Sequence, residues 1–119
     1  MKFSYTYYWN AEQDEKGRNI GLMDGYLPGH KLQIAHRGFI ETAVFPDVRK
    51  QSDLEMVAEA LFFNFNNPAK RPAGYRGPSM SIGSVIEIQG VCFRCMSFGF
   101  EITEIWQSPI ELGPWESSL

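Results

Sequence analysis

Hydrophobic and polar residues alternate in the N-terminal part of the chain. Residues 2–9 are rich in β-formers, and Phe3, Tyr5 and Tyr7 occupy every second position. Residues two apart lie on the same side of a β-strand. The pattern therefore predicts a strand over 2–9 with one buried face, while Tyr8 falls on the other face.

Two weaker alternating stretches follow, at 31–35 and 38–45. They predict two further strands, separated at Arg37-Gly38 by a turn or a β-bulge. The residues before them, 10–30, are charged or rich in Gly and Pro, and predict a turn followed by irregular structure.

The strongest helical signal lies at 53–66. Six apolar residues recur at helical spacing: Leu54, Val57, Ala58, Leu61, Phe62 and Phe65. This spacing puts a continuous apolar stripe on one helix face. Ser52 with Glu55 three residues later matches a capping box, so Ser52 is expected to be the N-cap. Asn-Asn-Pro at 66–68 is expected to end the helix.

The second half of the chain predicts a hairpin. Residues 69–78 are rich in Pro and Gly and predict an irregular loop. Alternation resumes at 80–88 and predicts a strand, with a bend permitted at Gly83. Gln89-Gly90 is a short hairpin connector, because glycine adopts positive φ easily. Residues 91–95 then predict the returning strand.

The predicted order of elements is β, β, β, α, β, β, β, with a last strand at 98–102 and an extended C-terminal tail at 103–119. We expect an α+β fold with one main helix and a mainly antiparallel sheet of about five or six strands. The pattern leaves open whether the sheet is barrel-like. A length of 119 residues suits a single domain over 1–119.

Composition favours a soluble chain with a hydrophobic core. Hydrophobic residues make up 44% and aromatics 14% of the sequence, which disfavours disorder. No apolar run approaches the ~20 residues of a membrane-spanning helix. Residues 1–9 lack the apolar stretch of a signal peptide. We therefore expect a cytoplasmic protein without a membrane partner.

Charge is distributed unevenly along the chain. The net charge of −3 is too small to indicate a partner. Residues 67–100 hold four bases and one acid, whereas residues 101–119 hold four acids and no base. These charges are interpreted as solvated faces. The alternative is a basic loop that meets an anionic partner.

The two cysteines, Cys92 and Cys95, have the spacing of a redox motif or half a zinc site. A redox pair normally lies at a helix N-terminus, but these flanks are β-like. Residues three apart on a strand point to opposite faces. His30 and His36 are six apart, which is not the usual spacing of zinc ligands. We expect reduced structural thiols, no metal and no cofactor, with a zinc site as the alternative.

Candidate catalytic groups are few. The serines of the second half form neither a Gly-x-Ser-x-Gly elbow nor a phosphate-binding loop. His30 and His36 are the only candidates for a general base near neutral pH, and neither lies in a motif with a nucleophile. We therefore predict no catalytic residue and expect a protein that is not an enzyme.

The loop at 70–81 holds the candidate binding residues. Its basic side chains are suited to bind phosphate groups, while a nucleobase could stack on its single aromatic ring, that of Tyr75. The alternative is a polar connector with Tyr75 packed inward. The candidates are Lys70, Arg71, Tyr75, Arg76, Ser79 and Ser81.

A longer pattern runs from Leu54 to Phe100. A helix that ends in Phe62-x-x-Phe65-Asn66 is followed by Tyr-Arg-Gly-Pro-Ser-Met-Ser-Ile-Gly-Ser-Val-Ile at 75–86. Phe93, Cys95 and Gly99-Phe100 come next. This order resembles the YodL-like small domains of phages, plasmids and integrative elements.

Two residues depart from the family pattern. Pro78 stands where the family often has Arg, and Ser84 stands where it usually has Asp. Any contact that depends on those charges is missing here. The resemblance implies a small α+β domain from a mobile element, and it implies no catalytic activity.

The sequence leaves three functions open. The first is a small non-enzymatic binding protein of a phage or other mobile element that docks onto a host or element-encoded protein, including as an inhibitor of host defence. Tyr and Trp are enriched at protein interfaces, and Trp9, Trp106 and Trp115 add to an aromatic surplus. The second is a nucleic-acid-binding module that uses the basic loop at 70–76. The third, an enzyme, has no motif in its favour.

Overall fold

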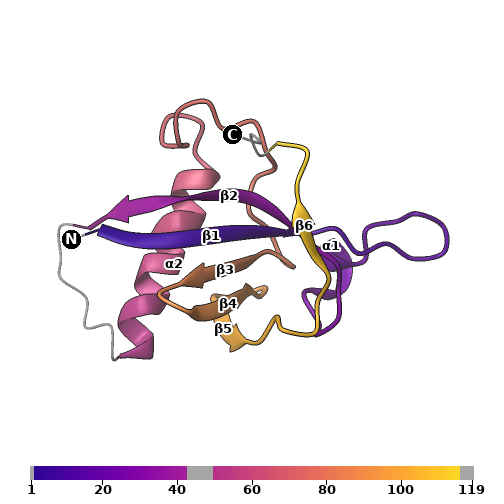
Figure 1. Cartoon of the computed structure of the whole chain (residues 1–119). Helices are drawn as coiled ribbons and strands as arrows, with labels where there is room; N and C mark the ends of the chain where they lie inside the picture. The colour runs from indigo at the N-terminus through magenta and orange to yellow at the C-terminus, as the bar shows by residue number, and fades with distance from the viewer. Residues whose placement is uncertain (1, 43–49, 116–119) are drawn as a thin grey trace.

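Six strands form one sheet, and one long helix lies across a face of it (Figure 1). The computed structural model of the chain describes residues 2–42 and 50–115. The elements are β1 (Lys2–Asn10), α1 (Gly21–Asp24), β2 (Leu32–Glu41), α2 (Gln51–Phe65), β3 (Val85–Ile88), β4 (Val91–Cys95), β5 (Phe100–Thr103) and β6 (Ile110–Leu112).

The strand order is β5-β4-β3-β1-β2-β6. Neighbours are antiparallel except β2 and β6, which are parallel. The α+β prediction, with a mainly antiparallel six-stranded sheet and one main helix, is confirmed. No pairing between β5 and β6 joins the ends of this order among the described strands, so the sheet is open and not a barrel.

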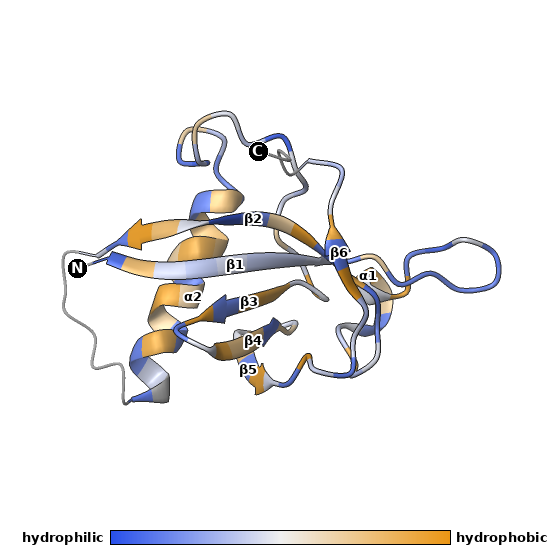
Figure 2. Ribbon diagram, in the orientation of Figure 1, coloured by the Kyte–Doolittle hydropathy of each residue, from blue (hydrophilic) through white to orange (hydrophobic). Residues whose placement is uncertain are grey.

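The main core lies between α2 and the sheet. The predicted stripe is buried at Leu54, Val57, Ala58, Leu61 and Phe65, with Phe62 packed at its margin. Phe3, Tyr5 and Tyr7 of β1 and Ile86, Ile88 and Phe93 of the β3–β4 hairpin face the same cluster. Figure 2 shows hydrophobic residues along α2 and in the strands that it crosses.

The start of α2 differs from the prediction. The helix begins at Gln51 and its N-cap is Lys50, which makes no side-chain cap hydrogen bond. The N–H groups of Asp53 and Leu54 donate to the Lys50 carbonyl at 3.1 and 3.3 Å. The assignment of Ser52 as N-cap was therefore wrong. Burial of the apolar stripe contributes more to the stability of the helix than an N-cap hydrogen bond does. The predicted end is confirmed, since α2 stops at Phe65.

One long strand, β2, replaces the two strands predicted at 31–35 and 38–45, of which 43–45 lie outside the described residues. The register against β1 shifts beside Ala35 and not at Arg37-Gly38. A Cβ at Gly38 would lie 3.2 Å from the Tyr5 hydroxyl oxygen. This glycine therefore makes room for a neighbouring ring while the strand continues.

A second, smaller core lies on the opposite face of the sheet. Its buried members are Tyr8, Tyr26, Leu32 and Val85. The prediction that β1 buries only one face was thus wrong at its C-terminal end. The segment 21–30, predicted to be irregular, contains α1 and carries Tyr26 into this core. The Tyr26 hydroxyl lies 2.7 Å from Ser108 Oγ, which ties the C-terminal segment to it.

The strand predicted over 80–88 is confirmed only at its end, β3. Met80 is buried in the main core without being part of a strand. A turn precedes β3, in which Ser81 N–H donates to Ser84 Oγ at 3.0 Å. The hairpin connector is confirmed, with φ of 52° at Gln89 and 81° at Gly90. The last predicted strand lies slightly later, as β5.

The C-terminal segment contains a strand that the sequence did not predict. β6 pairs with Leu32–Ile34 of β2, and Gly113 N–H donates to the Ile34 carbonyl at 2.9 Å. Trp115 then packs edge-on against Trp9, with ring centroids 5.6 Å apart. Trp106, by contrast, is 74% exposed.

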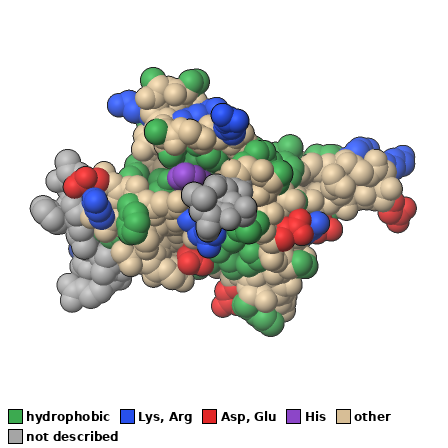
Figure 3. All heavy atoms as spheres, turned by 45° about the horizontal axis from the view of Figure 1, so that its top comes forward, with side chains coloured by type: hydrophobic (Ala, Val, Ile, Leu, Met, Phe, Trp, Pro, Cys, Tyr) green, Lys and Arg blue, Asp and Glu red, His purple; other side chains and the backbone are tan. Residues whose placement is uncertain are grey.

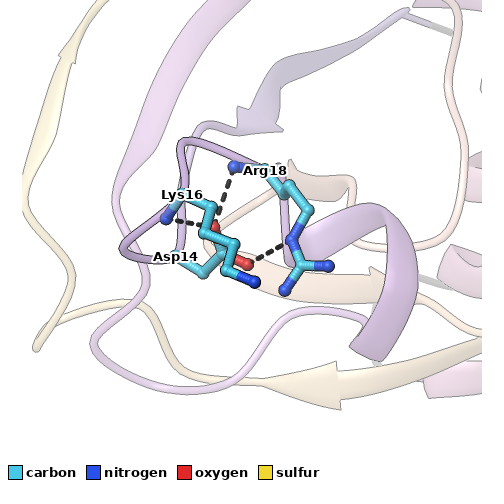
Figure 4. Close-up of polar contacts among 3 residues, drawn as sticks. All are labelled: Asp14, Lys16 and Arg18. Atoms are coloured by element: carbon cyan, nitrogen blue, oxygen red, sulfur yellow. Dashed lines mark hydrogen bonds and ion pairs between the residues drawn. The ribbon is translucent and has the colours of Figure 1, made fainter.

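The charged loop between β1 and α1 is organised by one carboxylate, that of Asp14 (Figure 4). It accepts hydrogen bonds from the backbone N–H groups of Lys16 and Arg18, both at 2.9 Å, and from Arg18 Nε at 2.6 Å. The backbone bond from Arg18 is the main cause that lowers the pKa of Asp14. This loop is therefore a locally hydrogen-bonded turn.

Candidate functional site

The predicted binding loop after α2 is fixed to the body of the protein by Arg71. Its Nε donates to the Phe65 carbonyl at 2.7 Å, and its Nη2 donates to Ser79 Oγ at 2.6 Å. From β1, the Tyr7 hydroxyl donates to the Ser79 carbonyl at 2.9 Å. Arg71 and Ser79 therefore hold the loop in place.

Tyr75 packs inward. Its ring lies edge-on to Phe65, with centroids 4.9 Å apart, and to His36, at 5.5 Å. Its hydroxyl donates to the Pro78 carbonyl at 2.5 Å. Burial raises the pKa of Tyr75 well above its ordinary value. The ring is half-buried against Phe65 and His36, and this favours the polar-connector interpretation over base stacking.

The remaining candidates divide into two kinds. Lys70 and Arg76 are exposed, whereas Ser81 is half-buried in the turn before β3. Figure 3 shows basic side chains on the lobe that the loop forms. The structure thus brings Arg71, Tyr75 and Ser79 together as a scaffold and leaves two cations at the surface.

Beside this scaffold lies a groove of about 310 Å³. Its walls are the C-terminal half of β2, the last turns of α2 and the loop. We call this space the β2 groove. Its lining includes Tyr5, His36, Phe39, Leu61, Phe65 and Lys70.

The chemistry of the β2 groove suits binding of an apolar side chain. The rings of Tyr5, His36 and Phe65 contact one another, with centroid distances of 5.9 Å from His36 to Tyr5, 5.7 Å from His36 to Phe65 and 6.1 Å from Tyr5 to Phe65. Burial raises the pKa of Tyr5 to about 12, so its hydroxyl stays protonated at neutral pH. Lys70 brings a positive charge to one side of the groove and Glu41 a negative charge to the other.

The other histidine has a structural position. His30 Nδ1 lies 3.1 Å from Asn10 Nδ2 and accepts a hydrogen bond from Leu27 N–H at 3.2 Å. These bonds tie the segment before β2 to the end of β1. Within residues 2–42 and 50–115, no group of three or more His, Cys, Asp or Glu side chains is placed to hold a metal ion.

The two cysteines are free and diverge across the sheet, as predicted from their spacing. Cys92 packs against the second core, and its Sγ lies 3.8 Å from Glu87 Oε2. Cys95 lies on the α2 side, where it lines a second pocket with Phe62. Burial raises the pKa of both thiols to about 11. The pair therefore does not form a joint metal or redox site.

These thiols predict a loss of stability at alkaline pH. A thiol whose pKa is higher in the folded state than its ordinary 9.0 stabilises the fold below about pH 9. That contribution is lost as the pH rises through about 11. Urea unfolding between pH 8 and 11 measures the decline. The double variant Cys92→Ala/Cys95→Ala should show a shallower decline, and an unchanged slope would contradict this account.

Of the residues that β2 contributes to the groove, His36 was a candidate from the sequence, whereas Phe39 and Ile40 were not. Phe39 is 73% exposed, although it belongs to a strand. Gly38 and Ile40 pair with Tyr5 and Phe3, so the Phe39 side chain points to the sheet face away from α2. The β2 side chains that face the groove on the α2 side are His36 and Ile40, which alternate along the strand.

None of the helices in the described part of the chain is long and apolar enough to cross a membrane. Comparisons of the chain with protein-family models, with curated proteins and with solved structures found no match in any of the three.

Proposed function

We propose that the chain is a small non-enzymatic binding protein that holds an extended segment of a partner protein in the β2 groove. The resemblance to YodL-like domains supports a phage or other mobile element as its setting. The partner is then a host or element-encoded protein, and inhibition of host defence is one consequence of docking. The groove beside the outer edge of β2 carries the proposal.

The edge of β2 offers backbone pairing next to the groove. β6 pairs only with Leu32–Ile34. Farther along, Gly38–Glu41 pair with β1 on one side, and no described strand lies on the other. An extended peptide can add to such an edge while alternate side chains enter neighbouring pockets.

The wall of the groove that the loop forms is held in place by hydrogen bonds. Arg71 and Tyr7 bind the loop through the hydrogen bonds to Phe65 and Ser79 described above. A wall that is already ordered lowers the entropy cost of binding. These bonds occupy Arg71, and the contacts with Phe65, His36 and the Pro78 carbonyl occupy Tyr75. Arg71 and Tyr75 are two of the four residues that a nucleic-acid site would use. This is why we favour a protein partner.

The charge of the groove lining indicates which kind of partner segment it prefers. Lys70 is the cation that lines the groove, so a carboxylate on the segment gains a favourable contact there. The aromatic walls accept an apolar side chain. We therefore expect the β2 groove to prefer an extended peptide with an acidic residue two positions from an apolar one, because residues two apart point to the same side of a strand.

The peptide acetyl-Thr-Asp-Thr-Phe-Thr-Asp-amide tests this preference, because its Asp and Phe side chains point to the same side of an added strand. It should shift the backbone amide NMR signals of Gly38–Glu41 and bind the variant Lys70→Glu about tenfold more weakly, which corresponds to ~1.4 kcal/mol. Arg76→Glu is the matched control, because it makes the same charge change outside the groove lining. Equal affinity for Lys70→Glu and the unmodified protein would refute the proposal.

The nucleic-acid alternative has its own signature. Phosphate contacts release counterions, so binding of single-stranded RNA or DNA must weaken steeply with salt. Strong salt-dependent binding that Arg76→Glu also weakens would favour that function over a protein partner.

A further inference from the structure

The opposite edge of the sheet, β5, is also open. β5 pairs only with β4, so its outer side faces no other described strand. Cys95 N–H donates to the Ser84 carbonyl, on the β3 side of β4. Because backbone groups alternate in direction along a strand, Arg94 then bonds with Glu101, and the N–H and C=O groups of Phe100 and Ile102 point outward.

An apolar pocket of about 210 Å³ adjoins this edge. It lies between α2 and the β4–β5 turn, and its lining includes Glu59, Phe62, Cys95, Met96 and Phe100. The rings of Phe62 and Phe100 meet edge-on at 6.1 Å. Methionine and aromatic side chains are adaptable and common at binding surfaces. A side chain of an added strand on the α2 side of the sheet would enter this pocket.

Large apolar side chains continue around the pocket. Phe98, in the β4–β5 turn, is 95% exposed, and Phe63, on the solvent side of α2, is 59% exposed. Contiguous exposed apolar surface beside a pocket is typical of an interaction site.

The charges around this edge are acidic. Glu59 is the one carboxylate in the pocket lining, and Glu55 lies one turn earlier on α2, near Gly99. On the other sheet face, Glu101 already binds Arg94 at 2.6 Å, so that cation is occupied. An approaching strand therefore meets the carboxylates of Glu55 and Glu59 on the α2 side.

We propose that β5 is a second docking edge, which binds a basic extended segment of a partner protein as an added strand. The outward N–H and C=O groups of Phe100 and Ile102 supply the backbone pairing. The pocket beside Phe62 takes one apolar side chain of the segment, and Glu59 pairs with a Lys or Arg. The site is separate from the β2 groove and prefers the opposite charge.

A second copy of this chain is a poorer occupant. Antiparallel pairing of two β5 strands about a two-fold axis would bring two copies of Glu101 close together. Like charges at facing positions destabilise a strand pair. A basic partner replaces this repulsion with attraction.

The peptide acetyl-Thr-Lys-Thr-Val-Thr-Lys-Thr-amide is the probe, because its Lys and Val side chains point to the same side of an added strand. It should shift the amide signals of Phe100 and Ile102, whereas the acidic peptide should shift those of Gly38–Glu41. Glu59→Lys should weaken its binding at least tenfold, and Glu15→Lys, in the β1–α1 loop, should leave it within twofold. The two peptides report on different edges, so failure at one edge is distinguishable from failure at the other.

Ile102→Pro tests the backbone part of the proposal. Proline removes the outward N–H without removing a bond to β4, which an edge strand tolerates. The variant should retain a cooperative thermal transition and lose at least tenfold in affinity for the basic peptide. Retained affinity in a folded Ile102→Pro protein, unchanged affinity of Glu59→Lys, or self-association through β5 without the peptide would each overturn the proposal.

Discussion

Replacing Leu61 with Asp is expected to abolish the cooperative unfolding transition. Leu61 is 2% exposed at the centre of the α2 stripe. The change forfeits ~1.5–3 kcal/mol of apolar burial. It also places a carboxylate where nothing compensates its lost hydration, at a cost of several kcal/mol more. Together these terms rival the ~5–15 kcal/mol by which a typical domain is stable. Circular dichroism during heating provides the measurement.

The matched control is Met56→Asp on the same helix. Met56 is 60% exposed, on the side of α2 away from the sheet. The same substitution there should shift the midpoint by only a few degrees, since surface changes usually cost within ~0.5 kcal/mol. A Leu61→Asp protein that melts cooperatively near the wild-type midpoint would disprove the core assignment.

Replacing Gly83 with Ala should destabilise the fold by ~2–5 kcal/mol, from backbone strain and steric overlap together. Gly83 has φ +94°, a left-handed conformation that favours glycine. An added Cβ would also lie 2.8 Å from the carbonyl carbon of Gly21, so the backbone at the start of α1 must move. The free energy of unfolding in urea measures the loss.

Gly90→Ala separates the cost of backbone strain from the cost of steric overlap. Gly90 has φ +81°, but nothing lies within 4 Å of an added Cβ. Its cost should therefore be the strain alone, ~1–2 kcal/mol. Equal costs at the two positions would mean that the close approach of Gly83 to Gly21 is not a tight contact.

The parts of the fold that were predicted correctly depend on local periodicity. The α2 stripe and the Gln89-Gly90 hairpin each specify their conformation over a few residues. Two strands were predicted where the structure has only β2, because a glycine at position 38 suggests the end of a strand. Its actual role, to make room for the Tyr5 ring, depends on tertiary structure. β6 was missed, because three exposed residues form a strand only through pairing with a distant segment.

The candidate site was likewise predicted only in part. The loop was located correctly, but the sequence did not indicate which of its side chains are free. Arg71 and Tyr75 looked like ligand-binding residues because they are basic and aromatic. Their partners, Phe65, His36 and Ser79, come from α2, β2 and the loop itself. Tertiary packing decides whether such a residue binds a ligand or supports a wall.

The position of β1 in the sheet has a consequence for synthesis. β1 is translated first, yet it is an interior strand that requires both β2 and β3 as neighbours. β2 follows at once, whereas β3 begins only at Val85. At ~5–20 residues per second, the edge that pairs with β3 waits on the order of several seconds after β1 leaves the ribosome. During that interval the β1 edge exposes unpaired backbone N–H and C=O groups, which makes the nascent chain a candidate for chaperone capture.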